Sequence, residues 1–311
     1  MEVKVFCIIV TYNAMKWIDK CLASLRTSSI KVLPVIIDNC STDESVDYIT
    51  TNYPEAHLIL NKKNKGFGQA NNQGIEYAYK QGASHFFLLN QDAWILSDTI
   101  EKLIYIQDKY FIDLISPIHL NGAGDLLDYN NLNYLVIQDY NIEFVTDLIL
   151  KNLKPYYTIS NINAAAWMIS KRTIEQIGGF DPVFFHYGED ENYCNRVKFH
   201  NGKIAFVPDS FIYHDRLKFG NLEVFNKYST YASLLTLYAN INNKFWSTIK
   251  MSVIIHLKHF ISAVKMLLKF DIKSFNSILL GYFTFIARIP KINRNMKKNK
   301  ISGSNWLMIN S

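Results

Sequence analysis

Four apolar residues, Phe86 to Leu89, are followed abruptly by Asn90, Gln91 and Asp92. A short apolar run of this kind is typical of a strand buried on both faces of a parallel sheet. Open α/β sheets bind ligands at the carboxyl ends of such strands. One carboxylate beside two amides supplies oxygen ligands for a hard cation and leaves positions for a phosphate. A strand followed by a plain polar turn is the alternative, so the surrounding sequence must decide.

The chain before this strand repeats one unit, which is an apolar strand, a polar loop and an amphipathic helix. We predict strands at 3–10, 32–37 and 57–60, and helices at 17–25, 44–51 and 69–80. Ser41 or Thr42 suits the N-cap of the second helix. Strands and helices that alternate at this spacing form a mainly parallel sheet with right-handed crossovers. The predicted fold class is therefore α/β, with a central sheet flanked by helices and all strand-following loops at one edge.

The loops at this edge suit the parts of a nucleotide diphosphate. Tyr12 offers a ring for a base, Asp38 an acceptor for a pyrimidine N–H, and the stretch Lys65 to Gly68 a close backbone approach. Each also has a plain structural reading, as a packed ring, a helix cap or a turn. Their order along one edge favours a binding site. The chain has neither GxGxxG after its first strand nor GxxxxGK[ST], which excludes the dinucleotide fingerprint and the P-loop.

Composition and charge indicate the cellular compartment and the kinds of binding partner. The 311 residues are 49% hydrophobic, as in a folded protein, and the four cysteines are scattered without metal-binding spacing. We therefore expect a reducing, cytoplasmic protein without a signal peptide. Residues 244–311 carry twelve lysines and arginines and one acid, Asp271, whereas the preceding part is net negative. The basic clusters lack the aromatic spacing of RNA-binding motifs, so no nucleic acid partner is expected.

The motifs together resemble a known family. Val10-Thr11-Tyr12-Asn13, the stretch from Asp38 to Asp43, the stretch from Asn64 to Gly68, and Leu89-Asn90-Gln91-Asp92 occur in the order found in family 2 glycosyltransferases of the GT-A (Rossmann-like) fold. The similarity is greatest to the rhamnosyltransferase-like and galactofuranosyltransferase-like branch of bacterial surface-polysaccharide enzymes, and it covers residues 3–217. It implies that a nucleotide-sugar donor is bound by Thr11, Tyr12, Asp38, Asn64, Lys65, Gly66, Gly68, Asn90, Gln91 and Asp92.

The resemblance also implies a divalent metal, Mg²⁺ or Mn²⁺. The family usually has an Asp-x-Asp metal motif, and here Asn90 takes its first position, which leaves Asp92 as the carboxylate ligand. In similar enzymes a histidine after the helix of the catalytic base completes the metal site, and His214 occupies that place. A single histidine after a strand is also often structural. We expect Asp92 and His214 to hold the metal.

The second half of the chain carries the predicted catalytic base. Residues 121–125 predict a turn, and the stretch from there to Ser160 predicts irregular strands and loops over an acceptor groove. Three acids, Glu189 to Glu191, then open a helix after an aromatic run. Acids in a first helical turn are ordinary, because they interact well with the helix dipole. Here they match the family's Glu-Asp motif, which makes Asp190 the general base and implies acceptor contacts for Glu189. Trp167, in a small-residue strand that is also similar to the family, is assigned to the acceptor too.

The C-terminal segment is predicted to form helices at 222–242, 245–269 and 272–288. No uncharged run reaches the roughly 20 residues that span a bilayer, so we do not expect a membrane-spanning helix. Basic-edged apolar helices suit the interface of an anionic leaflet, or packing on the catalytic domain or a second subunit. The apolar stripe consists of Val253, Ile254, Leu257, Phe260, Ile261, Val264, Met266, Leu267 and Leu268.

These features predict a catalytic domain over 1–220, with halves 1–110 for the nucleotide sugar and 111–220 for acceptor and base, and a helical region over 221–311. The predicted activity is inverting transfer of rhamnose or a hexose from dTDP-rhamnose or a UDP-hexose to a lipid-linked bacterial surface glycan. The enzyme would lie on the inner face of the plasma membrane, with a homo-oligomer as an open possibility. Two alternatives remain: a non-catalytic GT-A-like partner, suggested by Asn90, and a sugar nucleotidyltransferase, whose Gly-rich first loop is missing here.

Overall fold

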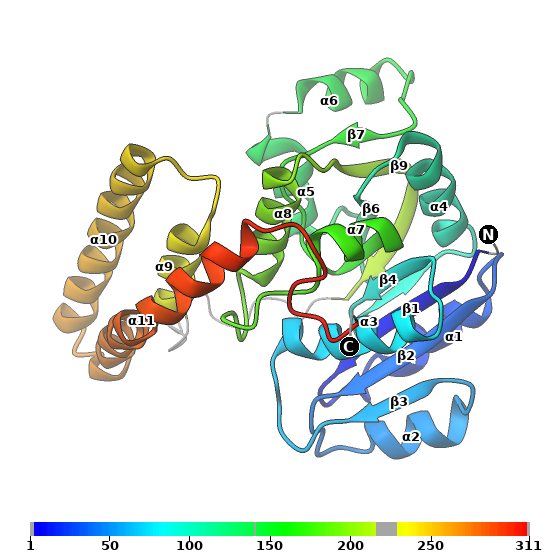
Figure 1. The fold of residues 1–311 in the computed structure, drawn as a ribbon, viewed down its shortest axis with the longest axis horizontal. Coiled ribbons are helices and arrows are strands. Elements are labelled where there is room, and N and C mark those ends of the chain that lie inside the picture. Colours follow the sequence, from blue (N-terminus) through cyan, green and yellow to red (C-terminus); the bar gives the residue numbers. More distant parts are fainter. Residues whose placement is uncertain (1–2, 140, 216–228, 310–311) are drawn as a thin grey trace.

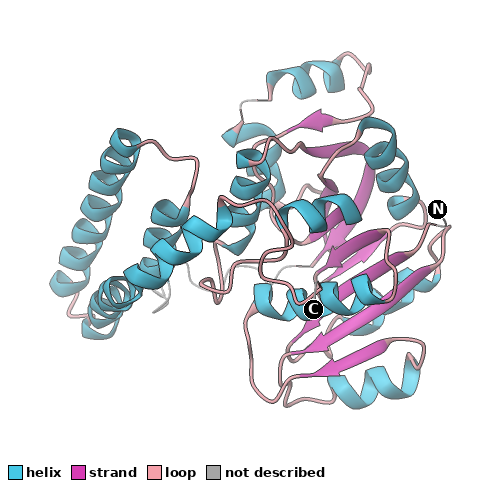
Figure 2. Ribbon diagram, viewed as in Figure 1, coloured by secondary structure: helices cyan, strands magenta, loops and turns pink. Residues whose placement is uncertain are grey.

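The alternation of strands and helices in the N-terminal half builds one central sheet. The computed structural model describes residues 3–139, 141–215 and 229–309. Its ribbon has the sheet with helices on both faces, and a lobe of helices beside it (Figures 1 and 2). The strands of the sheet are β1 (Val5–Thr11), β2 (Val32–Asp38), β3 (His57–Leu60), β4 (His85–Leu89), β5 (Ala93–Ile95), β6 (Leu114–Asn121), β7 (Tyr157–Thr158), β8 (Ala166–Ser170) and β9 (Ile204–His214).

The sheet is parallel in its first half and mixed beyond it. Its order is β3-β2-β1-β4-β8-β6-β9-β5, with β7 also paired to β9. Strands β1 to β4 pair in parallel, as predicted. Strand β8 is antiparallel to both β4 and β6, and β5 and β7 are antiparallel to β9. Strands β6 and β9 pair in parallel as well. The predicted parallel pairing therefore extends beyond the N-terminal half, and the antiparallel strands are β5, β7 and β8.

The helices agree with the predicted positions in the first half. They are α1 (Ile18–Arg26), α2 (Ser45–Asn52), α3 (Phe67–Lys80), α4 (Thr99–Tyr110), α5 (Tyr129–Leu132), a π-helix (Asn133–Gln138), α6 (Ile142–Ile149), α7 (Lys171–Ile177), α8 (Glu189–Phe199), α9 (Ser229–Ala239), α10 (Phe245–Leu268) and α11 (Ile272–Asn299).

Two local predictions are wrong. Neither Ser41 nor Thr42 caps α2; instead Oδ1 of Asp43 accepts a hydrogen bond from the Ser45 N–H at the start of the helix. The stretch from the turn at 121–125 to Ser160 was predicted to be irregular strands and loops, but its described residues form α5, the π-helix and α6 before the short strand β7.

Both faces of the sheet are buried. In β1, Phe6 and Ile8 point to one face and pack with α3 residues such as Ile75, whereas Cys7 and Ile9 point to the other face and pack under α1 and α4. Successive side chains of a strand alternate between faces, so burial of both faces requires the uninterrupted apolar run that the sequence has. The polar loops at the strand ends are thus held on a rigid base.

The end of the chain returns to the sheet. After the lobe of α9, α10 and α11, the C-terminal segment runs back over α7 to the neighbourhood of α3 (Figure 1). The Gly179 N–H donates to the carbonyl of Asn305 at 2.8 Å, and Leu307 packs against the sheet's hydrophobic core. The C-terminal segment therefore packs against the sheet and its flanking helices, although α10 itself leaves most of its apolar side chains exposed.

Two C-terminal predictions differ from the structure. Helix α11 continues through Pro290 to Asn299, beyond the predicted end at 288. By length and composition, α10 from Trp246 to Leu268 is able to cross a membrane, contrary to the expectation from uncharged runs, because its lysines are widely spaced. The start of the predicted helix 222–242 and the predicted domain boundary at 220 lie outside the described residues.

Candidate active site

Strand pairing brings together two residues that are far apart in the sequence. Strand β5 follows the polar turn after β4 and pairs antiparallel with β9, so that Ala93 lies opposite His214. The Asp215 N–H donates to the carbonyl of Asp92 at 2.9 Å and extends this pairing. As a result, Nε2 of His214 lies 3.3 Å from Oδ1 of Asp92.

A second carboxylate contacts the other side of the His214 ring. Oδ2 of Asp128 lies 3.4 Å from Nδ1 of His214, and both side chains are buried. Oδ1 of Asp128 accepts from the N–H groups of Asn130 and Asn131 and so caps α5. An imidazole that binds a metal through one nitrogen commonly gives its other N–H to a carboxylate in this way.

The donor set fits a divalent cation that is shared with a substrate. A carboxylate oxygen of Asp92 and an imidazole nitrogen of His214 lie 3.3 Å apart. Among the described residues, no group of three or more His, Cys, Asp and Glu side chains is arranged to hold a metal by itself. Mg²⁺ and Mn²⁺ sites in phosphate-transferring enzymes often have one or two protein ligands and take the others from phosphate and water. These two residues suit that kind of site.

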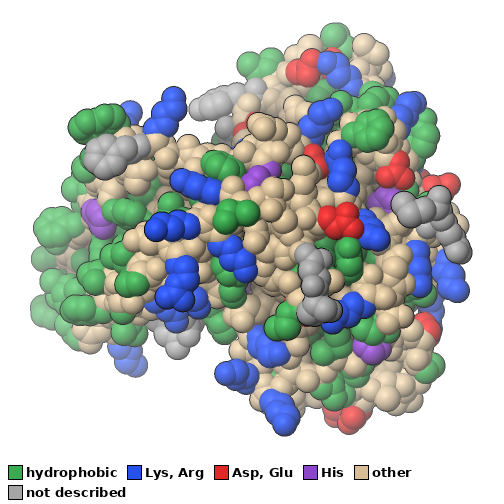
Figure 3. All heavy atoms as spheres, in the orientation of Figure 1, with side chains coloured by type: hydrophobic (Ala, Val, Ile, Leu, Met, Phe, Trp, Pro, Cys, Tyr) green, Lys and Arg blue, Asp and Glu red, His purple; other side chains and the backbone are tan. Residues whose placement is uncertain are grey.

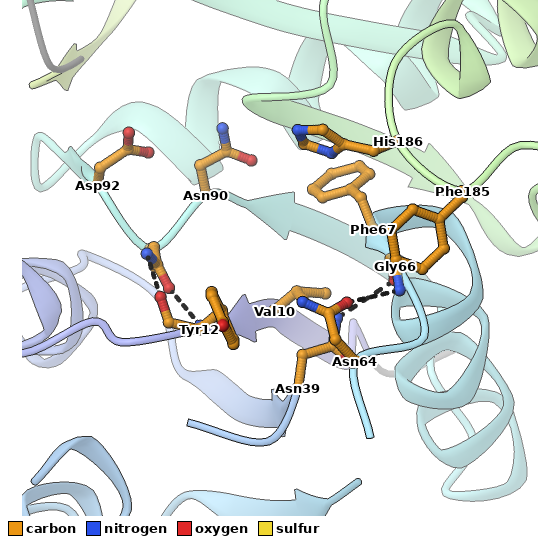
Figure 4. Close-up of a pocket in the computed structure, with 11 residues that line it drawn as sticks. Val10, Tyr12, Asn39, Asn64, Gly66, Phe67, Asn90, Asp92, Phe185 and His186 are labelled. Carbon is orange, nitrogen blue, oxygen red and sulfur yellow. Dashed lines mark hydrogen bonds between the residues drawn. The ribbon is translucent and has the colours of Figure 1, made fainter. Parts of the chain in front are cut away.

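A cavity of about 420 Å³, here called the donor cavity, opens at this edge of the sheet. Asn90 and Asp92 lie on one side of it, Tyr12 and Asn39 at its base, and His186 across from them (Figure 4). Its walls come from the ends of β1, β2 and β4 and from the loop before α3. The lining consists of Val10, Tyr12, Asn39, Asn64, Gly66, Phe67, Asn90, Gln91, Asp92, Phe185 and His186.

Side-chain amides fix the loops around the donor cavity. Oε1 of Gln91 accepts from the Tyr12 N–H at 2.8 Å, and Nε2 donates to the Tyr12 carbonyl at 3.2 Å (Figure 4). Asn39 donates to the Gly66 carbonyl and accepts from the Lys65 N–H. Gln91 and Asn39 therefore hold the backbone of the two loops that the cavity lies between.

The structure divides the predicted donor residues into two groups. Tyr12, Asn64, Gly66, Asn90, Gln91 and Asp92 line the donor cavity. Thr11, Asp38, Lys65 and Gly68 do not. Oδ1 of the buried Asp38 accepts from the hydroxyls of Thr11 and Ser41, and its Oδ2 accepts from the Ser41 N–H. Asp38 thus already orders the loop after β2, and Gly68 packs against Phe180 in the interior.

A second cavity of about 420 Å³, here called the acceptor cavity, adjoins the first. Both cavities have Phe67, Asn90 and His186 in their walls. Glu189, Asp190 and Glu191, from the start of α8, line the acceptor cavity, as do Ala232, Ser233 and Thr236 of α9. Asp190, the predicted base, and Asp92, a predicted metal ligand, therefore line adjoining cavities, whereas the buried His214 lines neither.

Burial gives Glu189 an unusual protonation state. The side chain is 6% exposed, and its Oε2 has no hydrogen-bond partner among the described residues. Burial, reinforced by the charge of Asp190, raises the pKa of Glu189 to about 8. Glu189 thus carries a proton at neutral pH and is a poor base. Asp190 is half-buried beside it and is the better candidate for that role.

The predicted acceptor contact of Trp167 is not compatible with the structure. Its side chain is 0% exposed and packs between Phe180 and Tyr193, and it lines neither cavity. Because both faces of β8 are covered, the sequence pattern does not tell which of its side chains reach a cavity.

Some cavity residues were not predicted from the sequence. His186 lines both cavities, and burial lowers the pKa of its imidazole, which keeps it neutral near pH 7. Tyr187 and Gly188, which follow it, both have positive φ angles. A left-handed conformation at a tyrosine is uncommon and often marks a functional loop. The aromatic run before the acids was visible in the sequence, but its turn into the shared wall was not.

Comparison with known proteins decides the family. Residues 6–178, more than half of the chain, match the family described as Glycosyl transferase family 2. The chain belongs to this family. Residues 146–218 of this glycosyltransferase also match the family described as N-terminal domain of galactosyltransferase. The predicted family is confirmed, and the protein is an enzyme of the glycosyltransferase class.

Individual relatives agree with this assignment. The glycosyltransferase is 24% identical over 217 residues to the dTDP-rhamnosyl transferase RfbF of Shigella flexneri, which covers 69% of this chain and 70% of that protein. The structure of S. aureus TarS 1-349 in complex with UDP-GlcNAc has a TM-score of 0.59 at 14% identity, over 96% of this chain and 88% of that one. GalNAc-T7 with UDP, GalNAc and Mn²⁺ has a TM-score of 0.58 at 17% identity, over 76% of this chain and 48% of that one. The fold is the GT-A fold with a C-terminal helical region.

Proposed function

We propose that this glycosyltransferase moves rhamnose or a hexose, with inversion, from a nucleotide diphosphate sugar to a hydroxyl of a lipid-linked bacterial surface glycan. The observation that carries the proposal is the shared wall of the two cavities. Asp92, in contact with the buried His214, lines one of them, and Asp190 lines the other. A donor phosphate and an acceptor hydroxyl in the two cavities would meet the anomeric carbon from opposite sides.

The proposed reaction is a direct displacement. The acceptor oxygen forms a bond to the anomeric carbon as the bond from that carbon to the diphosphate oxygen breaks. Asp190 takes the proton of the acceptor hydroxyl, and the nucleotide diphosphate leaves with the electron pair. Because a single base acts on the face opposite the leaving group, the product has inverted configuration and no covalent sugar intermediate forms. The protonated Glu189 can donate a hydrogen bond to an acceptor oxygen, which would orient it.

Asp92 and His214 are the residues that we propose to hold Mg²⁺ or Mn²⁺. A bound divalent cation would neutralise charge on the departing diphosphate. Asn90 supplies an amide oxygen where the family commonly has a carboxylate, so the protein contributes less negative charge to the cation than an Asp-x-Asp motif does. We therefore expect a metal affinity that depends strongly on the donor's phosphates.

Tyr12 is the part of the donor cavity that suits a base. It is half exposed at the rim, and Gln91 fixes its backbone. The exposed Asn64 nearby offers its side-chain N–H groups to a pyrimidine. We propose that the donor is dTDP-rhamnose or a UDP-hexose, in line with the printed names of the rhamnosyl transferase relative and of the UDP-sugar complex.

The helical lobe supports the proposal of a membrane-bound acceptor. Hydrophobic side chains gather on it among lysines and arginines (Figure 3). Leu268 and Phe270, for example, are 75% and 87% exposed. Exposed apolar surface with basic residues suits an anionic membrane. We propose that α10 and α11 place the enzyme on the inner face of the plasma membrane, with a second copy of the chain as the other possible occupant of this surface.

The transfer proposal is tested with donor binding and turnover in parallel. We expect UDP or dTDP to bind more tightly with Mn²⁺ in calorimetric titrations, and Asp92→Ala to remove that gain. Asp190→Asn should abolish transfer but leave nucleotide binding within about twofold of wild type. As a matched control, Asp47→Asn, at an exposed position of α2 outside both cavities, should retain both. Loss of nucleotide binding in Asp190→Asn would make Asp190 a structural residue and contradict the proposal.

The membrane proposal is tested with point substitutions rather than truncation, because residues beyond 292 pack against the hydrophobic core of the sheet-containing part of the protein. Replacing Lys250, Lys258, Lys265 and Lys269 by Glu should release the full chain from vesicles that contain phosphatidylglycerol. The charge-matched control replaces four exposed lysines of the sheet-containing part by Glu. These are Lys31, Lys62, Lys63 and Lys80. Equal flotation of both variants with these vesicles would contradict the membrane proposal.

A further inference from the structure

An apolar groove runs between the two long helices of the lobe. It has a volume of about 300 Å³ and is lined on one side by α10 and on the other by α11. Its α10 wall includes Ala263 and Leu267, and its α11 wall includes Phe275 and Leu279. This composition excludes a polar ligand over most of the groove, because charged or polar groups would lose their hydration without new partners.

A cluster of polar side chains closes one end of the groove. The hydroxyl of Tyr282 is 2.9 Å from Nδ1 of His256 and 3.2 Å from Nδ1 of His259. Nε2 of His259 is in turn 3.1 Å from the hydroxyl of Ser233 on α9. Burial, together with the neighbouring His256, lowers the pKa of His259. This end of the groove therefore carries no fixed positive charge on His259 at neutral pH, which favours a hydrocarbon over an anion as the occupant.

The same cluster connects the groove to the acceptor cavity. Ser233 lines the acceptor cavity together with Glu189 and Asp190, and its hydroxyl contacts His259, which lines the groove. The contact between Ser233 and His259 thus joins the walls of the two spaces. A molecule with a polar head in the acceptor cavity and an apolar chain beyond Ser233 would have a continuous path.

The surface around the groove is apolar as well. Phe260 and Phe283 are 66% and 68% exposed on the two helices, and the hydrophobic side chains of this lobe are gathered in Figure 3. A hydrocarbon chain that leaves the groove would continue over apolar surface rather than into water.

We propose that the groove between α10 and α11 binds the hydrocarbon chain of a lipid-linked acceptor, at the end of the chain nearest the polar head. This inference rests on the proposed transfer to a lipid-linked glycan and names the part of the protein that recognises the lipid. Binding of the hydrocarbon chain in this groove would position the acceptor hydroxyl at Asp190. This effect would add to any general attraction of the enzyme to the membrane.

The test uses the full chain and geranylgeranyl monophosphate below its critical micelle concentration, with binding measured by calorimetry. Ala263→Trp and Leu279→Trp fill the groove from its two walls. Ile261→Trp, on the exposed side of α10 and outside the groove, is the matched control. We expect the two groove variants to weaken binding at least about tenfold and the control to bind as wild type. Thermal unfolding of each variant checks that it is folded. One folded groove variant is enough for the test.

Each other outcome is decisive. Equal binding by wild type, both folded groove variants and the control would overturn the proposal, since the probe would then bind elsewhere. A dimer of the wild type that Ala263→Trp dissociates, without lipid binding, would assign the groove to a second copy and also overturn it. UDP binding is measured separately. If the probe binds as expected but UDP does not, the lipid groove stands and the transferase proposal fails.

Discussion

Nδ1 of His214 lies 3.4 Å from Oδ2 of Asp128, on the side of the ring that does not face Asp92. This contact fixes the ring so that Nε2 is presented to the position beside Asp92. Asp128 does not line the donor cavity. It is therefore a positioning residue for the proposed metal ligand.

Asp128→Asn should lower the affinity for Mn²⁺, measured in the presence of UDP, by about 10-fold to 100-fold, the usual effect of removing a carboxylate partner from a metal-binding histidine. Asparagine is also a good N-cap, so α5 should keep its start. Calorimetry and the electron paramagnetic resonance signal of Mn²⁺ measure the change. The exposed neighbour Asp125→Asn is the control. Unchanged Mn²⁺ affinity in Asp128→Asn would remove Asp128 from the metal-binding arrangement.

Glu189 should make the stability of the protein depend on pH. Its pKa is about 8 in the folded protein and near 4.5 when unperturbed. Between these values the folded state holds the extra proton, so the free energy of unfolding falls as the pH rises from about 4.5 to about 8. The total change is on the order of a few kcal/mol. Glu189→Gln removes it, so the melting temperature of this variant relative to wild type should rise from pH 5 to pH 8.

Thermal unfolding at both pH values measures this effect. The exposed Glu44→Gln should show the same difference from wild type at pH 5 and pH 8. The same constant difference in Glu189→Gln would show that the Glu189 carboxyl ionises normally.

Gly66 and Gly82 allow a matched test of the close contact between Gly66 and Phe185. Both have positive φ, +80° and +82°, but a Cβ on Gly66 would lie 2.0 Å from the Phe185 carbonyl oxygen, whereas a Cβ on Gly82 meets nothing within 4 Å. Gly82→Ala should cost about 1 kcal/mol of stability from backbone strain alone. Gly66→Ala should cost at least about 2 kcal/mol more and weaken UDP binding. Urea unfolding and nucleotide titration measure both. Equal losses in the two variants would argue against a close contact of Gly66 with Phe185.

Asp181 should hold the C-terminal helix on the acceptor side of the enzyme. The carboxylate is 1% exposed and accepts hydrogen bonds from the side-chain amides of Asn295 at 2.5 Å and Asn299 at 2.8 Å. Asp181→Ala leaves both buried amides without this partner and should lower the free energy of unfolding by about 2 to 4 kcal/mol. Asp209→Ala, at an exposed ion pair with Lys102, should lower it by less than about 1 kcal/mol. Similar losses in urea unfolding would contradict this role.

Local sequence patterns were enough to predict the short-range features of this protein. The apolar runs of β1, β2 and β4 and the amphipathic pattern of the intervening helices predicted a sheet edge with Tyr12, Asn64, Asn90 and Asp92 along it, and the structure has this arrangement. These features follow from side-chain periodicity and from the common direction of parallel strands, which are short-range properties. The order of motifs also indicated the family.

Which distant residues contact each other depends on the long-range packing of the fold. His214 reaches Asp92 because β5 pairs with β9 in one register, across more than a hundred residues of chain. Trp167 points into the core because β8 is covered on both faces, which periodicity cannot resolve. Asp181 and the groove between α10 and α11 depend on how the C-terminal helices return to the sheet. Strand register and helix docking are set by the packing of many distant side chains at once, and a local sequence pattern does not contain that information.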